Sequence, residues 1–350
     1  MNIGKREIAN FKKPYIIAEL GANHNGDMAI AHKLIDAAKQ AGCDCVKFQS
    51  WSKESLFSKK IYSVGADNLK TKKAGAEPSL KELLDKYSIS KDSLREMAAY
   101  CSKAGIDFSS SAFCEEEVDF LCDELKVPFV KVASMDVNYH SFLDYMGKKG
   151  RPIVLSTGLS TMAEIESAVK VIEGTGNRNI AILHCVSIYP LSDKLVNLNN
   201  LDALRDRFPR YPIGFSDHTL GVAVALGAVA KGSSIIEKHF TLDRQMEGWD
   251  HAVSATPGEM KAIVEGSRRI AQALGSYERV VSETEKANIS NYRRSLVAAR
   301  RIESGQKIRR EDLTAKRPGS GIPADQLASI IGKSAKRTIE ADELLMKGDF

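Results

Sequence analysis

Short apolar runs alternate with helical apolar patterns along the first three quarters of the chain. After the first run, for example, apolar residues recur at helical spacing at Met28, Ala31, Leu34, Ile35 and Ala38. Eight such runs of five or six residues are Tyr15–Glu19, Cys45–Gln49, Ile106–Ser111, Phe129–Ser134, Pro152–Thr157, Ile180–Cys185, Pro212–Asp217 and Ile235–Phe240. Repeated strand-then-helix units are typical of parallel α/β folds, and eight of them within roughly 275 residues predict a closed (β/α)8, or TIM, barrel.

The predicted helices have recognisable ends. Asp27 precedes the first one as an N-cap, and Gly42 follows its last turn. Further helices are expected over Lys91–Ala104, Glu115–Glu124, Met162–Glu173, Val222–Lys231 and Gly258–Leu274.

One connection is longer than an ordinary strand-to-helix loop. A Lys-, Ser- and Gly-rich stretch follows Gln49 and includes Lys59-Lys60 and Thr71–Gly75 before a helix near Leu80. It lies on the catalytic side of a barrel, so the sequence is compatible both with a mobile lid and with a merely solvated insertion.

The last quarter has a different composition. The polar segment Ser276–Asn291 predicts a linker after a catalytic domain of residues 1–275. We place the linker at 276–290 and a small domain at 291–350, too small to hold much core alone. In it we expect a helix at Ala324–Ile331 and short strands at Ser295–Ile302, Gln306–Ile308, Leu313–Arg317 and Ser334–Ile339.

Charge and cysteine content restrict the class of protein. The chain has 50 Lys and Arg against 45 Asp and Glu, a net charge of +5 that does not require nucleic acid and suits small anionic substrates. Met1 is followed by charged residues, and no apolar run approaches the ~20 residues that span a bilayer, so we expect no signal peptide and no membrane contact. The six cysteines lack paired CxxC spacing, which indicates reduced thiols in a cytoplasmic protein rather than a zinc site.

Every predicted strand ends in polar or ionisable residues. A single one of these has a structural explanation as a turn residue or a misjudged register, but barrel enzymes assemble their active sites at the carboxyl ends of the strands. These residues are Glu19, Lys47 with Gln49, Ser110-Ser111, Lys131 with Ser134, Ser156-Thr157, His184 with Ser187, Ser216 to His218, and Glu237 to His239.

Two histidines suit a metal ion. His218 and His239 lie on adjacent predicted strands, where two imidazoles could bind a divalent ion such as manganese, zinc or iron. A histidine there can also be a packed core residue, and the pair favours the metal. Glu19, Glu237 and Asp250 are the nearby carboxylates that could orient water, act as bases or complete the ligation.

Two lysines suit an anion. Lys47 and Lys131 point from the second and fourth strands into the same end of the barrel, where a Schiff-base lysine is the competing interpretation. The histidine pair and a set of surrounding hydroxyls favour a bound phosphate with a carboxylate. The hydroxyls belong to Ser111, Ser134, Ser156, Ser187 and Ser216.

Ordered motifs carry a family resemblance. IIAELGANHNGD, VKFQSW, KVAS, LSTGLST, HCVSIYP, GFSDHT and EKHFT resemble the successive signatures of the sialic acid (N-acetylneuraminate) synthase family. RPGSGI resembles the C-terminal antifreeze-like, or SAF, domain of that family, and the match runs from near Ile16 to the end of the chain.

The resemblance implies a transferase that condenses phosphoenolpyruvate with an N-acylated amino sugar of the N-acetylmannosamine type. It implies a divalent ion, typically Mn²⁺ with Mg²⁺ or Co²⁺ as alternatives, on His218 and His239, with Glu19 and Asp250 as catalytic carboxylates and Glu19 acting on the attacking water. Phosphoenolpyruvate would be bound by Lys47, Ser111, Lys131, Ser134, Ser156, Ser187 and Ser216. The sugar would be contacted by Gln49, Asp136, Tyr189 and Asp250, and by Arg317 from the SAF domain of the other subunit of a domain-swapped homodimer.

Departures from the family pattern leave the sugar open. Ala133-Ser134-Met135-Asp136 stands where some relatives have Ser-Gly-Glu, and Ser111 and Ser187 replace a Thr and an Asn. A legionaminic or pseudaminic acid synthase, or an enzyme for a 6-phosphorylated sugar, is therefore an alternative. Ala22 to Gly26 looks closer to the neuraminate and legionaminate branches than to the pseudaminate branch.

Two further classes of function have less support in the sequence. A non-catalytic carbohydrate-binding scaffold would have no need to bury the histidines, the lysines and Glu19. Nucleic-acid binding rests only on Arg300-Arg301 and Arg309-Arg310, which suit a solvated or interfacial face.

Overall fold

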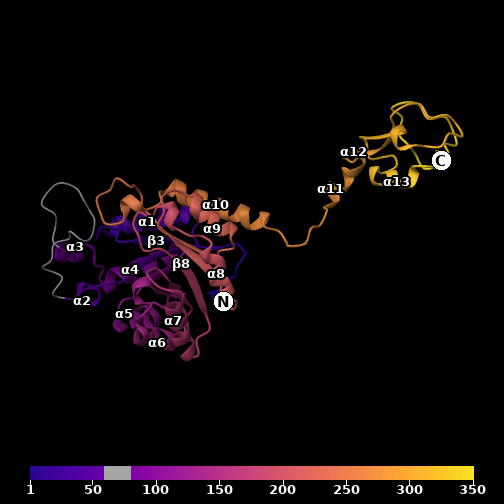
Figure 1. Cartoon of the computed structure of the whole chain (residues 1–350). Helices are drawn as coiled ribbons and strands as arrows, with labels where there is room; N and C mark the ends of the chain where they lie inside the picture. Colours follow the sequence, from indigo (N-terminus) through magenta and orange to yellow (C-terminus); the bar gives the residue numbers. More distant parts are fainter. Residues whose placement is uncertain (59–79) are drawn as a thin grey trace. The chain divides into compact units, whose positions relative to one another are not determined.

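The computed structural model describes residues 1–58 and 80–350, which form two compact units, Met1–Gly275 and Ser276–Phe350 (Figure 1). Helix α2 (Lys53–Leu56) ends before the remaining stretch, and α3 (Leu80–Tyr87) begins after it. The part of the long connection with Lys59-Lys60 and Thr71–Gly75, compatible with a lid or a solvated insertion, lies outside the described residues.

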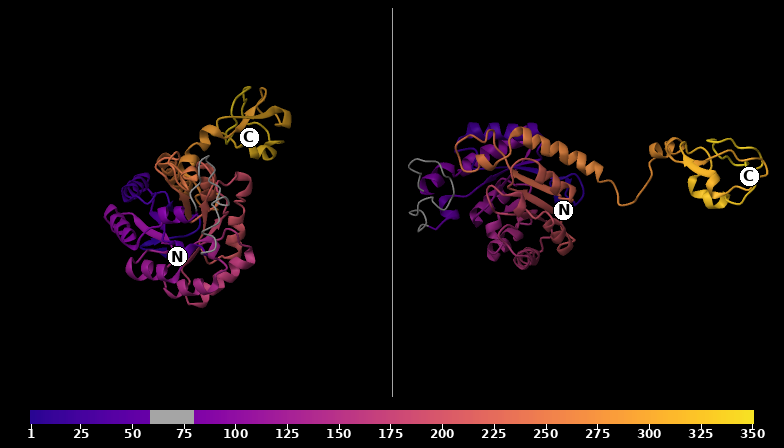
Figure 2. Two further views of the ribbon diagram at one scale, coloured as in Figure 1. Left: turned by 90° about the vertical axis from the view of Figure 1, so that its left-hand side faces the viewer. Right: turned by 45° about the horizontal axis from the view of Figure 1, so that its top comes forward.

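The first unit is the predicted barrel. Eight parallel strands close into a ring in which each strand pairs with its neighbours in sequence and β10 pairs with β3. Figure 2 shows the helices surrounding this ring. The strands are β3 (Tyr15–Gly21), β4 (Cys45–Gln49), β5 (Asp107–Ser111), β6 (Val130–Val132), β7 (Ile153–Ser156), β8 (Ile180–Cys185), β9 (Ile213–Asp217) and β10 (Ile235–His239).

The helices follow the predicted rhythm with some differences. Helix α1 has the expected caps, since Asp27 accepts from the backbone N–H groups of Ala29 and Ile30 and Gly42 adopts φ 88°. The predicted helix Glu115–Glu124 is instead α5 (Glu115–Asp119) followed by a π-helical turn. The other long helices are α1 (Met28–Ala41), α4 (Lys91–Ala104), α6 (His140–Lys148), α7 (Met162–Gly174), α8 (Asn200–Arg207), α9 (Ala223–Ala230) and α10 (Pro257–Ala273).

Two of these helices, α6 and α8, were not predicted. Both are short, and α8 buries only Leu201 and Leu204 among eight residues, so its apolar period is weak. Tertiary packing rather than local pattern determines a helix such as α8, whereas α6 buries Phe142, Leu143 and Met146 at helical spacing.

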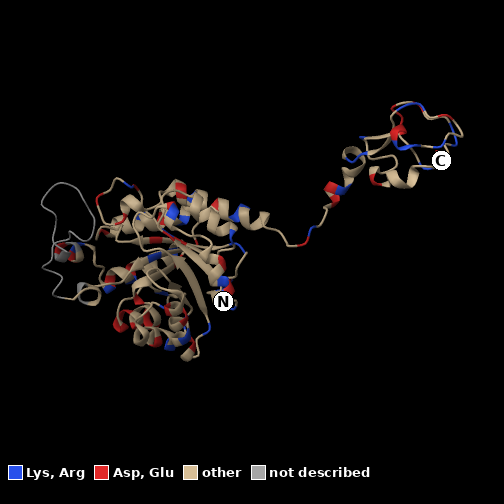
Figure 3. Ribbon diagram, in the orientation of Figure 1, with Lys and Arg blue, Asp and Glu red and all other residues tan. Residues whose placement is uncertain are grey.

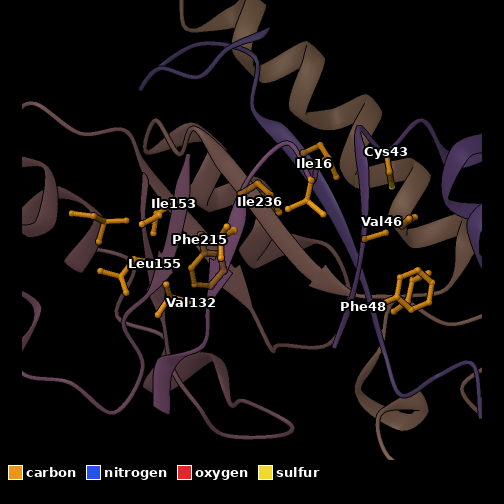
Figure 4. Packing of buried hydrophobic residues seen from close by; sticks show 14 of the residues in the cluster. Ile16, Cys43, Val46, Phe48, Val132, Ile153, Leu155, Phe215 and Ile236 are labelled. Carbon is orange, nitrogen blue, oxygen red and sulfur yellow. The ribbon is translucent and has the colours of Figure 1, made fainter. Parts of the chain in front are cut away.

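The barrel is apolar outside and at its amino-terminal end. Outward-facing strand residues such as Val46, Phe48 and Phe215 pack against the helices (Figure 4). An N-terminal hairpin is formed by β1 (Asn2–Ile3) and β2 (Arg6–Glu7). Ile3 of this hairpin and Ile8, which follows it, pack inside the barrel against inward residues at the strand starts. This plug fills the lower interior, so the inward polar residues gather at the carboxyl end, which we call the mouth.

The second unit has its own core. Strands β11 (Ser295–Ala298) and β12 (Leu313–Lys316) pair antiparallel over a cluster of buried apolar residues. The expected strands Gln306–Ile308 and Ser334–Ile339 form only isolated bridges, Lys307 with Ser334 and Ile302 with Ile339, because turns interrupt them. The cluster is Leu296, Ala298, Ile302, Ile308, Leu313, Ile322, Ile330, Ala335, Ile339 and Leu345.

The predicted helix of the second unit is also broken. A 3₁₀ turn at Ala324–Gln326 leads into the short α13 (Leu327–Ile330). The segment expected to be a linker contains α11 (Glu283–Ala287), capped by Ser282, and α12 (Ile289–Tyr292). The polar composition of this segment therefore indicated that its residues are exposed to solvent, not that the segment lacks helices.

The surface of the first unit carries charges of both signs, which are mixed over its helices (Figure 3). Within the part of the chain that the structure describes, no helix is both long and apolar enough to cross a membrane.

Candidate active site at the mouth of the barrel

The barrel separates the polar strand ends into two sets. Side chains alternate between the faces of a strand, so residues in step with the interior apolar layer point into the barrel and the others point to the helices. The inward set within the strands is Glu19, Lys47, Gln49, Ser111, Lys131, Ser156, Ser216, Glu237 and His239, and Ser134, Ser187 and His218 lie in the segments that follow β6, β8 and β9. The outward set is Ser110, Thr157, His184, Asp217 and Lys238.

The outward set is hydrogen-bonded within the fold. His184 Nε2 lies 2.6 Å from the carbonyl oxygen of Val196, and Thr157 Oγ1 donates to the carbonyl oxygen of Leu183 at 2.9 Å. The hydroxyls of Ser110 and Ser50 lie 2.5 Å apart. The prediction that every polar strand end joins one site is therefore wrong for these residues, which hold strands and loops together.

Lys47 is buried among carboxylates in the inward set. Its side chain is 3% exposed, and its Nζ pairs with Glu19 Oε2 and donates to Ser111 Oγ at 3.1 Å. A second carboxylate oxygen, Glu237 Oε2, lies 3.8 Å from the same Nζ. Burial lowers the pKa of Lys47, but Glu19 and Glu237 outweigh it and raise that pKa overall.

Lys131 faces Lys47 across Glu237. Its Nζ donates to Ser156 Oγ at 2.7 Å and lies 3.8 Å from Glu237 Oε1, which also accepts from Ser216 Oγ at 2.9 Å. Burial lowers the pKa of Lys131. Burial would raise the pKa of Glu237, but the two lysines bring it down to about 2. Two buried ammonium groups and hydroxyls thus surround one carboxylate, an arrangement that can hold a multivalent anion.

Glu237 is a central residue that the sequence analysis named as a polar strand end and as a nearby carboxylate, without a role beside the lysines. The register of β9 and β10 puts it opposite Ser216, between the two lysines. Strand parity relative to Ile235 could have identified it as inward, because Ile235 lies in the interior apolar cluster.

A second group of hydroxyls converges on the loop after β7. The backbone N–H of Gly158 donates to Ser134 Oγ at 3.0 Å, and Ser134 Oγ lies 3.5 Å from Cys185 Sγ. A Cβ on Gly158 would collide with Ser187 Oγ and lie 2.9 Å from Ser134 Oγ. Gly158 therefore leaves space between two predicted anion-binding hydroxyls, and Cys185, which the sequence analysis did not select, faces the same space.

Filling this space tests its role. We expect Gly158→Ala to weaken the binding of inorganic phosphate about 10-fold or more, because the methyl group displaces Ser134 and Ser187. Isothermal titration calorimetry of the full chain measures this. Gly174→Ala is the matched control, since a Cβ there meets no atom within 4 Å and Gly174 ends helix α7. Equal phosphate affinity in the two variants would show that these hydroxyls bind no phosphate.

The two histidines are arranged as metal ligands often are. Their ring centroids are 5.6 Å apart. His218 Nδ1 lies 2.8 Å from the carbonyl oxygen of Val186, so Nδ1 carries the proton and Nε2 keeps its lone pair. Burial, aided by the neighbouring His239, lowers the pKa of His218 to about 3, which keeps it neutral.

His239 has an unused ring nitrogen. Its Nδ1 is buried without a hydrogen-bond partner and lies 3.7 Å from Asp250 Oδ2. Within residues 1–58 and 80–350, no three His, Cys, Asp or Glu side chains are grouped closely enough to hold a metal. The nitrogens that could bind a divalent ion are His218 Nε2, because Nδ1 carries the proton, and the unpartnered Nδ1 of His239.

Glu19 is oriented by a short relay. Gln49 Nε2 donates to Glu19 Oε1 at 2.9 Å, and Trp51 Nε1 donates to Gln49 Oε1 at 3.1 Å. Burial raises the pKa of Glu19 against the opposing effect of Lys47. A Cβ on Gly21, whose φ is +48°, would lie 2.9 Å from Asp250 Oδ2, 3.3 Å from Glu19 Oε1 and 3.4 Å from Gln49 Nε2. The absence of a side chain at Gly21 therefore lets Glu19, Gln49 and Asp250, three predicted site residues, lie close together.

The other predicted sugar residues are distributed differently. Tyr189 is half exposed, and its ring centroid lies 4.1 Å from that of His218. Asp136 follows β6 in a 3₁₀ turn, has one carboxylate oxygen without a hydrogen bond, and has its pKa raised to about 6 by burial. Arg317 belongs to the second unit, where its guanidinium lies 5.3 Å from the ring centroid of Tyr292. Tyr189 thus joins the histidines, while Arg317 is described only within its own unit.

The Ala22–Gly26 motif acts as a clamp between loops. Asn23 Nδ2 donates to the carbonyl oxygen of Phe240 and to Ser254 Oγ, both at 2.9 Å. Asn25 Nδ2 donates to the carbonyl oxygen of Glu247 at 2.8 Å. These contacts hold the loop after β10, which carries Asp250, and they give the motif a structural role.

Aromatic side chains support the same loop. Trp249 packs against Trp51 and Tyr87 with ring centroids 5.8 and 5.5 Å apart. Trp51 follows β4 and Tyr87 ends α3, so three separate segments meet beside the Gln49 relay. The sequence analysis did not select these rings, because nothing local indicates that they meet.

Two cavities lie away from the mouth. One of about 250 Å³ lies between α7 and the segment 207–211, and one of about 410 Å³ is lined by Val224 and residues within 193–200. Neither is lined by the lysines or carboxylates of the mouth. The buried lysines and carboxylates therefore lie at the mouth of the barrel and not in these cavities.

The chain is similar to known proteins over most of its length. Residues 34–279 match the NeuB family and residues 293–350 match the SAF domain. The chain is 38% identical to an N,N'-diacetyllegionaminic acid synthase of Campylobacter jejuni, with 95% of this chain and 99% of the relative covered. It is 35% identical to the human N-acetylneuraminate-9-phosphate synthase, with 95% and 91% covered.

A solved structure has the same fold. The N-acetylneuraminic acid synthetase of Leptospira borgpetersenii, crystallised with citrate, aligns with a TM-score of 0.73 at 30% identity, covering 83% of this chain and 94% of that one.

Proposed function

This chain belongs to the NeuB family of sialic, legionaminic and pseudaminic acid synthases, and from that premise we propose that it condenses phosphoenolpyruvate with an open-chain N-acylated amino sugar. The proposed sugar is of the N-acetylmannosamine type. The product would be a 2-keto-3-deoxy acid of the N-acetylneuraminate type, released together with inorganic phosphate.

One observation carries the proposal: Lys47 and Lys131, each about 3% exposed, lie on both sides of Glu237 at the mouth and donate to Ser111 and Ser156. Glu19 and Glu237 pair with these lysines in the structure, and a ligand with both phosphate and carboxylate could bind both ammonium groups together with the surrounding hydroxyls. The hydroxyls of Ser134, Ser187 and Ser216 would complete the phosphate site. The neighbouring His218 and His239 would lie beside the second substrate, the amino sugar.

The bonds change as follows in this proposal. C3 of phosphoenolpyruvate attacks the aldehyde carbon, whose oxygen takes up a proton, and positive character develops at C2. Glu19, held by Gln49, orients a water molecule that adds to C2 and gives its proton to this carboxylate. The bond between C2 and the phosphate oxygen then breaks, while the C2 hydroxyl gives its proton to the departing phosphate and becomes the ketone carbonyl. The proton accepted by Glu19 returns to solvent and balances the one that the aldehyde oxygen takes up, and Lys47 and Lys131 stabilise the phosphate.

The proposed cofactor is a divalent ion, Mn²⁺ in the first instance, on His218 and His239. When bound, such an ion supplies Lewis-acid polarisation of the aldehyde oxygen. Asp250, close to His239, and Tyr189, above His218, would position the sugar at this point. Asp136 would contact it further out, and Arg317 would come from the second unit of a partner in a domain-swapped homodimer.

The identity of the sugar has a second candidate. The chain is 38% identical to a diacetyllegionaminic acid synthase and 35% identical to an N-acetylneuraminate-9-phosphate synthase, so a diamino sugar or a 6-phosphorylated sugar is the alternative substrate. Asp136 is where these would be distinguished, because its carboxylate retains an oxygen without a hydrogen bond.

A product assay tests the function. The full chain is incubated with phosphoenolpyruvate, Mn²⁺ and a panel of aldoses in ¹⁸O-labelled water. We expect phosphate release only with an N-acylated amino sugar, with ¹⁸O in the keto acid product and none in the phosphate. Label in the phosphate would contradict C–O cleavage. No phosphate release with any aldose or metal would favour a non-catalytic carbohydrate-binding scaffold.

A further inference from the structure

A buried ion pair lies on the outer face of the barrel, directly behind the two histidines. Lys238 Nζ lies 2.7 Å from Asp217 Oδ2, and the two side chains are 1% and 0% exposed. They are register partners on β10 and β9. Because they point toward the helices, they cannot contact a ligand at the mouth.

The pair extends into a network around the turn after β9. Lys238 Nζ also donates to the carbonyl oxygen of Thr219 at 2.6 Å. Asp217 Oδ1 accepts from the backbone N–H of Thr219 at 2.8 Å and from its hydroxyl at 2.7 Å. Both carboxylate oxygens and two donors of Thr219 are therefore used, and the turn is fixed on both sides of His218.

This network flanks both histidines. Asp217 and Thr219 are the chain neighbours of His218, and Lys238 is the chain neighbour of His239. His218 itself is fixed at its ring by the Val186 carbonyl oxygen and at its own carbonyl oxygen by the N–H of Leu191 at 3.0 Å. A displacement of β10 relative to the turn would move one ring relative to the other.

Stability alone gives little reason for charges at this position. Desolvation of a buried ion pair costs free energy that its mutual attraction often only balances, and apolar side chains of similar volume can hold two strands as well. What an apolar pair lacks is direction, whereas four hydrogen bonds to defined atoms allow one arrangement of strand and turn.

We propose that Asp217 and Lys238 are positioning residues that set the placement of His218 relative to His239 and thereby the affinity for the divalent ion. The inference rests on the proposed function of the histidine pair. Each of the motifs GFSDHT and EKHFT would then contain an outward positioning residue followed by an inward metal ligand. These are Asp217 with His218 and Lys238 with His239. Metal ligands held by such supporting hydrogen bonds lose about 10- to 100-fold in affinity when the support is removed.

The test measures Mn²⁺ binding rather than activity. The double variant Asp217→Asn with Lys238→Gln keeps hydrogen-bonding capacity and removes both charges together. We expect its dissociation constant for Mn²⁺, followed by the electron paramagnetic resonance of the free ion, to rise about 10-fold or more. Its affinity for inorganic phosphate should fall less than its affinity for Mn²⁺, because Lys47 and Lys131 lie on β4 and β6 and only Ser216 and Glu237 of the anion site neighbour the substituted pair.

A control for the loss of both charges uses a second Lys–Asp pair of the same barrel, whose side chains are 29% and 48% exposed. Lys231 Nζ lies 2.6 Å from Asp202 Oδ2 beside helices α8 and α9, away from the histidines. Asp202→Asn with Lys231→Gln makes the same chemical changes, and we expect Mn²⁺ affinity to remain unchanged. A loss of Mn²⁺ affinity in both double variants would indicate general destabilisation and overturn the proposal.

A milder variant covers the case in which the double variant does not fold. Thr219→Val removes only the hydroxyl bond to Asp217, and we expect Mn²⁺ to bind about threefold more weakly. Unchanged Mn²⁺ affinity in either folded variant overturns the positioning role. If the unchanged protein itself binds no Mn²⁺, the proposed metal function has failed, and the inference fails with it for that distinct reason.

Discussion

Replacing Lys131 by methionine is expected to lower kcat/KM for phosphoenolpyruvate by about 1,000-fold, which corresponds to roughly 4 kcal/mol of lost transition-state stabilisation. The reason is electrostatic. Lys131 is buried, and methionine fills a similar volume while leaving Glu237 beside Lys47, which also pairs with Glu19. An incoming phosphate would then meet an unbalanced carboxylate in a site of low dielectric constant.

Steady-state kinetics and phosphate calorimetry on the full chain check this result. Lys170→Met, on the exposed face of α7, is the control for loss of a lysine charge and should leave both quantities unchanged. If Lys131→Met bound phosphate as tightly as the unchanged protein, the anion site would not involve β6, and the assignment of the phosphate position would be wrong.

Replacing His218 and His239 together by alanine should reduce metal-dependent turnover about 10,000-fold or more while the barrel remains folded. Both side chains lie at the carboxyl ends of strands, above the apolar interior layer that Ile17, Phe129 and Leu183 form, so the core is not emptied. Loss of both imidazoles also removes the nitrogens that fit a divalent ion, and bound Mn²⁺ should fall to the background level.

His184→Gln is the control for this pair of substitutions. His184 is also a buried histidine at a strand end, but it points outward, where Nε2 lies 2.6 Å from the Val196 carbonyl oxygen. We expect this variant to lose some stability against urea and to keep full Mn²⁺ affinity. Full turnover in the His218/His239 double variant, or equal loss of Mn²⁺ in the control, would contradict the metal assignment.

Much of the architecture could be predicted from the sequence because it depends on short-range periodicity. All eight strands were predicted, and β4 and β8 have the predicted bounds. The apolar runs and the helical spacing that follows them are properties of neighbouring residues, and they determine element type and order. Where local signals were weak, as in α8 and in the bridges of the second unit, the prediction failed.

The residues of the candidate site were predicted in the same way, but the contacts between them were not. The inward residues Lys47, Lys131 and His239 could be proposed from their positions near strand ends. Nothing local indicated that Glu237 lies between the lysines at 3.8 Å from each, or that Gly158 leaves space for Ser134 and Ser187. These relations join segments more than 20 residues apart.

The sequence by itself therefore determined the order of strands and helices, the residue types at the strand ends and the family. The tertiary structure decided which of those side chains face the interior. It separated His239 from Lys238 and Ser216 from Asp217, although each pair is adjacent in the chain, and it paired the outward members into a buried network. The physical reason is that a strand repeats every two residues, so a side chain's face is determined only when register and barrel closure fix the strand against its neighbours.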